Sequence, residues 1–495
     1  MASQLLATKS IVELHEQEST GNQLRRALTA TQLTLLGIGG IIGTGIFVLT
    51  GTAAANHAGP ALALSFIVAG LGCTFAGLCY AEFAAMIPVS GSAYSYSYAT
   101  LGEGIAWFIG WNLILEYLFA VATVSVGWSG YAVSLLEQLH IHIPSALSLA
   151  PLGPGADQMH IVRTGAIINL PAMVIVAAIA TICYIGIKQS AAFNSVIVVI
   201  KVTVVVLFIV FGVSYINTVN WHPFIPPNTG RTGEFGWSGI MAASGVIFFA
   251  YIGFDAISTA AQEAKNPQRD MPIGILASLV VCTILYVVVA VVLTGMVSYK
   301  ELDVSAPVAL ALDKYTGLHW LGIPVKLGAV CGMTSVMLVM TIAQARIFFA
   351  MARDGLLPPF FGRVHPRFRT PSTATVITGV SAAIIGGLFP VNLLGEVVSI
   401  GTLAAFVTVC LGVLVLRRTR PDLPRPFRTP WPWFVCIAGA LVCGYMMYSL
   451  GTPTWWRLGL WTALGVIVYA AYGYKHSCVR KARAADGPRA ATRTA

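Results

Sequence analysis

Long apolar stretches alternate with short polar segments along most of this 495-residue chain. None of them shows the regular alternation of polar and apolar residues that is typical of membrane β-strands. An apolar run of about 20 residues can cross a bilayer as an α-helix. The pattern predicts twelve such spans, at about residues 33–54, 61–86, 104–136, 165–184, 192–215, 237–261, 273–297, 323–351, 372–389, 392–415, 431–450 and 455–473.

The composition agrees with an all-α polytopic membrane protein. Hydrophobic residues make up 57% of the chain and charged residues 10%, whereas globular proteins carry roughly 25% charged residues. The net charge of +10 could indicate a nucleic-acid partner, but most Lys and Arg residues gather at the two termini and in the even-numbered loops. By the positive-inside rule these segments are cytoplasmic. We therefore predict a multi-pass protein of the cell (inner) membrane with both termini cytoplasmic, in contact with lipid and not with nucleic acid.

A glycine-rich stretch in the first span reads GIGGIIGTGIF from Gly37 to Phe47. Glycine costs about 1 kcal/mol relative to alanine in a helix interior, but it lets the backbone unwind or lets another group come close. Unwound backbone at membrane depth needs protein or a cavity to satisfy its hydrogen bonds. Two interpretations fit the stretch by itself: a helix broken around a small-molecule site, or a seam for tight helix packing.

The sixth span is the second unusual helix, because it contains Gly245, Gly253 and the ionisable Asp255. If this helix is continuous, Ile252 and Asp255 share a face. A kinked core helix whose backbone satisfies Asp255 is an alternative. Spans one and six are five apart, as expected of two inverted repeats that each open with a broken helix. Free amides at such breaks attract an anion and free carbonyls attract a cation, and a zwitterionic amino acid carries both charges.

Further ionisable residues lie inside predicted spans, where burial requires a reason. Lys201 lies in span five with apolar residues on both sides, roughly 12 Å deep at 1.5 Å per residue. It is a candidate proton carrier, and a lysine that reaches the headgroups is the alternative. Glu116, in the middle of span three, could pair with Lys201, handle a proton or brace polar backbone. Glu82, near the cytoplasmic end of span two, is predicted to be a gate or a structural contact.

Several longer motifs resemble those of one transporter family. They are GIGGIIGTGIFVLTG, YAEFAAMIPVSGSAYSY, the segment from Trp111 to Tyr117, FFAYIGFDAISTAAQEAKNPQRDMP and ARDGLLPP. With this set the chain resembles the amino acid–polyamine–organocation superfamily over nearly all of residues 30–475, and within it the bacterial homologues of cationic amino acid transporters. The resemblance implies a leucine-transporter-type fold of 12 transmembrane helices, in which a 5+5 inverted repeat is followed by two C-terminal helices.

The implied organisation divides the chain into five segments. Residues 1–30 form a cytoplasmic N-terminal segment, 31–216 the first inverted repeat, 217–415 the second, 416–475 helices 11 and 12, and 476–495 a basic cytoplasmic tail. The first 30 residues are polar and lack a signal-peptide cleavage pattern, so we expect the first span to be retained. Eukaryotic cationic transporters of this kind usually have two further helices, for which this chain has no room.

The resemblance also implies a substrate site made largely of backbone. The amides that would donate to the substrate carboxylate belong to Thr44, Gly45 and Ile46. The carbonyls that would accept from the amino group belong to Ile41, Phe249, Ala250 and Ile252. The Phe249 ring would form part of the gate over the substrate. Asp255 would belong to the same site, near a basic side chain.

The resemblance implies proton coupling as well. In sodium-coupled relatives of the fold an ion sits between helices one and eight, and in proton-coupled members a helix-five lysine takes that place. Lys201 matches this lysine. Glu116 would couple to Lys201 and to helix one. No metal or cofactor is implied, and three loop histidines (His140, His142 and His160) are interpreted as solvated residues.

The predicted function is proton-coupled uptake of amino acids, cationic and/or small neutral such as alanine, by alternating access. Span eight presents Met333, Met337 and Met340, and a bulky methionine that faced the site would favour small neutral substrates. An exchanger of amino acids or polyamines, or a non-transporting amino acid sensor, is the alternative. An enzyme is not predicted, because the chain lacks GxSxG, HExxH and phosphate-loop motifs.

Overall fold

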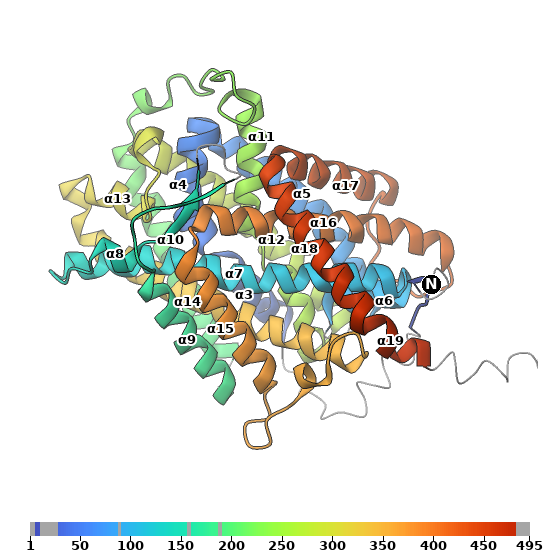
Figure 1. The fold of residues 1–495 in the computed structure, drawn as a ribbon. Helices are drawn as coiled ribbons and strands as arrows, with labels where there is room; N and C mark the ends of the chain where they lie inside the picture. Colours follow the sequence, from blue (N-terminus) through green and yellow to red (C-terminus); the bar gives the residue numbers. More distant parts are fainter. Residues whose placement is uncertain (1–4, 10–27, 88–90, 156–159, 187–190, 482–495) are drawn as a thin grey trace, which may run out of the picture.

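The computed structural model describes residues 5–9, 28–87, 91–155, 160–186 and 191–481. Within these residues the chain forms a helical bundle with one small pair of strands (Figure 1). Residues 1–4 and 10–27 of the predicted N-terminal segment, and residues 482–495 of the predicted tail, lie outside the described residues. The division of the chain into two repeats and two terminal helices stays a prediction.

The α-helices vary widely in length. The longer ones are α3 (Ala30–Ile41), α5 (Leu62–Met86), α6 (Ser92–Thr100), α7 (Glu103–Gln138), α9 (Leu170–Ile185), α10 (Ala191–Gly212), α11 (Gly236–Ile247), α12 (Pro267–Met296), α14 (His319–Arg353), α15 (Ser372–Leu388), α16 (Val391–Thr419), α17 (Pro432–Ser449) and α18 (Thr452–Val468). The short ones are α4 (Thr50–Ala53), α8 (Ser145–Ser148), α13 (Pro307–Asp313) and α19 (Tyr474–His476).

Tighter and wider helical turns interrupt this pattern. The 3-10 segments are Gly59–Ala61, Val213–Tyr215, Thr218–Trp221, Phe248–Tyr251, Asp255–Glu263, Tyr299–Glu301, Thr316–Leu318 and Pro359–Gly362. The π-helical segments are Gly45–Leu49, Ala54–Ala58 and Tyr469–Gly473. Strands β1 (Leu152–Pro154) and β2 (Ile161–Arg163) pair antiparallel, with Leu152 opposite Arg163.

Eight helices in the described part of the chain are long and apolar enough to cross a membrane. Three further apolar helices, α3, α9 and α15, are shorter. The run Gly45–Met86 counts as one helix, because short π and 3-10 turns carry the second half of the first predicted span directly into the second. The protein is therefore multi-pass, and the total of twelve spans stays a prediction.

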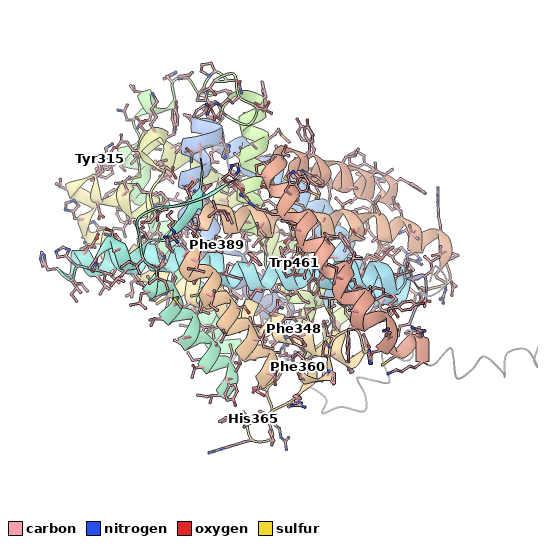
Figure 2. All side chains as sticks on the ribbon, in the orientation of Figure 1. Tyr315, Phe348, Phe360, His365, Phe389 and Trp461 are labelled. Carbon is pink, nitrogen blue, oxygen red and sulfur yellow. The ribbon has the colours of Figure 1, made fainter. Side chains whose placement is uncertain are left out.

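Helix α7 lies in the middle of the bundle and packs against α14 and α16, while α12 packs against α3 and α5. Helix α18 crosses α7 on the outside (Figure 1). The two are joined by Trp111 and Trp461, whose ring centroids lie 4.8 Å apart in a stacked arrangement; Trp461 is labelled in Figure 2. Each indole nitrogen donates to the other residue's carbonyl, at 2.8 and 3.1 Å. These contacts attach one face of α7 to α18, so the other faces of α7 point toward the rest of the bundle.

Residues 5–9 are packed into the bundle although they precede the first helix. The Lys9 ammonium group forms a 2.5 Å ion pair with Asp354, just after α14, and Tyr94 donates to the same carboxylate at 2.7 Å. The Glu103 amide at the start of α7 donates to the carbonyl of Ala7 at 3.0 Å. The N-terminal segment thereby links the beginning of α7 to the end of α14.

Glu82 is a structural contact in this conformation. Its buried carboxylate accepts from Arg417 of α16 at 2.6 Å and from the Thr429 amide at 2.8 Å. Arg425 lies 3.4 Å from the other oxygen. Of the two roles expected from the sequence, the contacts favour the structural one, because the ion pair attaches the loop between α16 and α17 to α5.

Candidate functional site

The first span is broken just after α3. The helix ends at Ile41, Ile42 takes an extended conformation (φ −72°, ψ 102°), and helical geometry resumes at Thr44. A Cβ atom on Gly43 would lie 3.0 Å from a methyl group of Val336 in α14. Because a helix end leaves its last carbonyls and its first amides without intrahelical partners, both kinds of backbone group are available at this break.

The sixth span is broken as well. Helix α11 passes into the 3-10 turn Phe248–Tyr251, Ile252 is extended (ψ 134°), and Gly253 has φ +122°. The chain then continues as the 3-10 segment Asp255–Glu263. The helix is therefore not continuous at this point, and Ile252 and Asp255 do not share a helical face.

The two breaks contact each other through glycine. A Cβ atom on Gly40 would lie 3.2 Å from the Gly253 carbonyl oxygen, and one on Gly253 would lie 2.7 Å from the Gly40 carbonyl oxygen. A Cβ atom on Gly45 would overlap the backbone of Ala250. Both interpretations of the glycine-rich stretch thus apply, because the glycines that unwind the first helix also let the second broken helix approach it.

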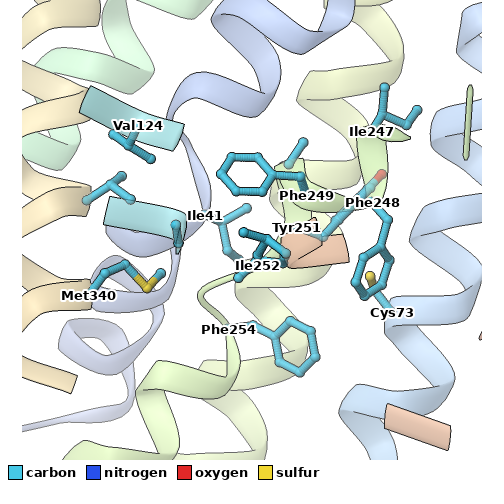
Figure 3. Packing of buried hydrophobic residues seen from close by; sticks show 14 of the residues in the cluster. Ile41, Cys73, Val124, Ile247, Phe248, Phe249, Tyr251, Ile252, Phe254 and Met340 are labelled. Carbon is cyan, nitrogen blue, oxygen red and sulfur yellow. The ribbon is translucent and has the colours of Figure 1, made fainter. Parts of the chain in front are cut away.

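A small cavity lies where the breaks meet. It is lined by Gly40, Ile41, Gly43, Thr44, Gly45, Ala120, Val124, Phe249, Ile252, Val336 and Met340. Figure 3 shows Val124 and Met340 on one side of this region and Phe249 and Ile252 on the other. Of the predicted substrate residues, Ile41, Thr44, Gly45, Phe249 and Ile252 line the cavity, whereas Ile46, Ala250 and Asp255 do not.

One tyrosine joins the backbones of the two breaks. The Tyr286 hydroxyl of α12 lies 3.0 Å from the Ile41 carbonyl oxygen and 2.9 Å from that of Ala250. A hydroxyl carries one proton, so it can donate to only one of these acceptors at a time. Sequence reasoning missed Tyr286, because nothing in the apolar seventh span distinguishes it from a core aromatic residue.

Lys201 of α10 lies against the first break. Its buried ammonium group donates to the carbonyl oxygens of Gly39 and Ile42, the latter at 3.0 Å, and to the Ser335 hydroxyl of α14 at 3.3 Å. The side chain therefore does not reach toward a membrane surface. It lies between the broken helix and α14, which is the place that the resemblance implied.

Glu116 and Asp255 are both fully buried, but neither contacts Lys201. Asp255 accepts from the Tyr117 hydroxyl at 2.6 Å and from the Gly253 amide at 3.3 Å. Within the described ranges no ion pair joins Asp255 to a basic side chain, so the expected basic neighbour is replaced by Tyr117. Neither carboxylate oxygen of Glu116 has a hydrogen-bond partner among the described residues, and its predicted coupling to Lys201 is not a direct contact.

The methionines of α14 take different positions. Met340 lines the cavity, and its neighbour one turn earlier along the helix is Val336. Met333 instead accepts from the Thr44 hydroxyl, at 3.2 Å, and Met337 is buried outside the lining. The walls contributed by α7 and α14 are thus entirely apolar at Ala120, Val124, Val336 and Met340.

Several known proteins are similar to this chain over most of its length. A family model described as amino acid permease matches residues 28–472. The methylthioribose transporter of Bacillus subtilis (strain 168) is 48% identical over 476 residues, which cover 96% of this chain and 99% of that protein. The branched-chain amino acid permease BcaP of the same organism is 48% identical over 478 residues, which also cover 96% of this chain and 99% of that protein. Cationic amino acid transporter 4, vacuolar, of Arabidopsis thaliana is 38% identical over 84% of this chain and 68% of its own length.

Proposed function

Because the chain belongs to the amino acid permease family of the amino acid–polyamine–organocation superfamily, we propose that it imports amino acids with protons by alternating access. The family consists of transporters, so the prediction that the protein is not an enzyme is confirmed. The observation that carries the proposal is the meeting of two helix breaks around one small cavity. The breaks offer amides on one side and carbonyls on the other.

The substrate backbone would be held by these groups. The carboxylate would accept from the amides at the start of the second half-helix, at Thr44, Gly45 and Ile46, where the helix dipole also favours an anion. The ammonium group would donate to the carbonyls of Phe249 and Ile252 and to whichever of Ile41 and Ala250 the Tyr286 hydroxyl leaves free. Phe249, which is buried and lines the cavity, would form part of the gate.

The side-chain walls support a neutral substrate. Ala120, Val124, Val336 and Met340 offer no charged or polar group to a side chain in the cavity. Asp255 is outside the lining and already accepts from Tyr117, so a lysine or arginine substrate would lose its hydration without gaining a counter-charge. Within the predicted range of cationic and/or small neutral amino acids, we therefore favour neutral ones with apolar side chains.

Proton coupling would act through Lys201. In its charged form the ammonium group bonds two carbonyls at the broken end of α3 and Ser335 of α14. Loss of the proton would weaken these bonds and release the first half-helix, which would favour opening to the cytoplasm. Glu116 would be a second proton-handling group, separate from Lys201. Asp255 would position α7 against the second break through Tyr117.

The proposal includes the predicted membrane arrangement. Twelve spans, a 5+5 inverted repeat with two further helices, and both termini in the cytoplasm would place the Lys9–Asp354 ion pair on the cytoplasmic side. The two broken helices would then open the two repeats. Cysteine labelling of residues at the two chain ends in intact cells, with a membrane-impermeant reagent, would test this topology.

Transport by purified protein in proteoliposomes tests the function. With an acidic exterior we expect uptake of labelled alanine or leucine above the level reached at equal pH, and collapse of this excess by a protonophore. Arginine uptake should be weak. Methylthioribose should be tested as well, because one relative is a methylthioribose transporter, but the walls from α7 and α14 offer its hydroxyl groups no polar side chain. Uptake confined to arginine or to methylthioribose would contradict the proposal.

Two alternatives have distinct signatures. An exchanger would show counterflow of labelled substrate but no net uptake driven by a pH difference. A sensor would gain thermal stability with an amino acid and show no flux at all. Polyamines lack a carboxylate, so they would leave the amides near Gly45 without a partner.

A further inference from the structure

A second polar site lies away from the cavity, between α7 and α16. Asn112 and Glu116 are one turn apart on α7, and Ser399 and Thr402 are three residues apart on α16, so each pair lies on one helix face. The two helices pack closely here: a Cβ atom on Gly401 would lie 3.6 Å from the Asn112 side-chain oxygen. All four polar side chains are at most 1% exposed.

These four side chains present oxygen atoms that have no protein partner. By hydrogen-bond geometry, both oxygens of Glu116, Oδ1 of Asn112, Oγ of Ser399 and Oγ1 of Thr402 lack a partner among the described residues. The Thr402 hydroxyl nevertheless lies close to the Glu116 carboxylate, so these two groups face each other across the interface. The great majority of buried polar side-chain atoms in proteins have a partner. Such a concentration of unpartnered oxygens at one helix interface therefore indicates a ligand.

The local hydrogen bonds leave oxygens rather than nitrogens facing the interface. The Asn112 amide nitrogen donates to the Phe108 carbonyl at 2.8 Å, which leaves its oxygen free. Hydroxyls elsewhere in these helices bond back to their own helix, as Thr408 does to Ala404 and Thr123 to Phe119, at 2.8 and 2.7 Å. Ser399 and Thr402 make no such bond within the described structure, so their hydroxyls stay available between the helices.

The charge balance points to a cation. In the part of the chain that is described, Glu116 has no positively charged partner, and the second buried carboxylate, Asp255, makes the region more negative. A buried carboxylate without a counter-charge is unfavourable. Hard cations prefer oxygen ligands. One carboxylate combined with amide and hydroxyl oxygens suits a single positive charge.

We propose that Asn112, Glu116, Ser399 and Thr402 form a binding site for a monovalent alkali cation such as sodium. Glu116 is four residues before Ala120, which lines the cavity, or roughly 6 Å along α7. A bound cation would hold α7 and α16 together directly beside the substrate site. The cation and the proton assigned above to Glu116 would compete for the same carboxylate, so they would exclude each other.

Thermal unfolding of the purified protein tests the site, because a ligand of the native state raises its stability. Samples at one pH and constant chloride would contain increasing sodium or potassium in exchange for choline. We expect a saturable rise of the unfolding temperature with sodium or potassium, and a smaller rise at lower pH, where protons compete. Thr402→Val and Ser399→Ala should lose this rise. Thr408→Val, on the same helix but with a hydroxyl bonded to Ala404, should keep it.

Two results would overturn the cation site. One is an unfolding temperature that follows pH but not the alkali cation, since the occupant would then be a proton with water. The other is a cation effect that persists in both Thr402→Val and Ser399→Ala. An amino acid added to the same samples reports on the substrate cavity separately, so failure of the cation site would be distinguishable from failure of the proposed transport function.

Discussion

The ammonium group of Lys201 donates a 3.0 Å hydrogen bond to the carbonyl oxygen of Ile42, at the point where the first helix of the fold breaks. The same group bonds the carbonyl of Gly39 and the hydroxyl of Ser335. The Lys201 ammonium group thus bonds carbonyls that the break would otherwise leave unpaired, and it joins α10 to α3 and α14. The charge state of a single side chain is therefore linked to the position of the half-helix beside the cavity.

Replacing Lys201 should separate proton coupling from exchange. Hydrogen bonds to charged groups contribute about 1.5–3 kcal/mol each, so Lys201→Ala should reduce uptake driven by a pH gradient by about tenfold or more. Counterflow of substrate should persist to a greater extent. Ser335→Ala is the matched control, because it removes only the longest of the three bonds and should cause a smaller loss. Undiminished pH-dependent uptake by Lys201→Ala would refute the role of this lysine.

Gly45→Ala should abolish substrate binding. The added methyl group would overlap the Ala250 backbone, so the two breaks could not approach and the amides beside Gly45 would be displaced. Substrate-induced thermal stabilisation measures this loss directly. Gly444→Ala in α17 is the control, since a Cβ atom there meets nothing within 4 Å and should leave binding intact while stabilising the helix by about 1 kcal/mol. Normal binding by Gly45→Ala would separate this glycine from the substrate site.

Met340→Ala should change the preferred substrate size. Met340 lines the cavity, and its truncation would enlarge the cavity for bigger neutral substrate side chains. Because a few methylene groups in an apolar pocket change selectivity by about tenfold or more, the ratio of leucine or phenylalanine uptake to alanine uptake should rise to that extent. Met337→Ala, which is buried outside the lining, should leave the ratio unchanged. Equal ratios in the two variants would place the side-chain pocket elsewhere.

Glu82→Ala should act on stability rather than on transport. Removing one partner of a buried ion pair costs about 3–5 kcal/mol, and Glu82 bonds both Arg417 and the Thr429 amide. We expect a clearly lower unfolding temperature, with substrate affinity close to that of the parent protein in the folded fraction. A normal unfolding temperature combined with lost transport would instead make Glu82 a gate.

Part of the candidate site could be predicted from the sequence, because the helix breaks and the buried lysine have local signals in the chain. Helix breaks follow from glycine, whose preference acts within a few residues, and Lys201 stands out against an apolar span. Residues such as Tyr286, Ala120 and Val336 could not be found this way. They are ordinary residues of apolar helices, and only the packing of α12, α7 and α14 around the breaks gives them a place in the site.

The sequence also did not determine which groups the buried side chains of Glu116 and Lys201 contact. Glu116 and Lys201 were candidate partners, but the helices direct Lys201 to the Ile42 carbonyl and Glu116 to the α16 interface. A transmembrane helix can rotate about its own axis with little change in its internal energy. The order of its residues therefore does not determine which helix face packs against which neighbouring helix. The sequence by itself determined a multi-pass helical permease with two glycine-bearing helices. The tertiary structure alone decided which side chains surround the cavity, because helix orientation depends on contacts between segments that are distant along the chain.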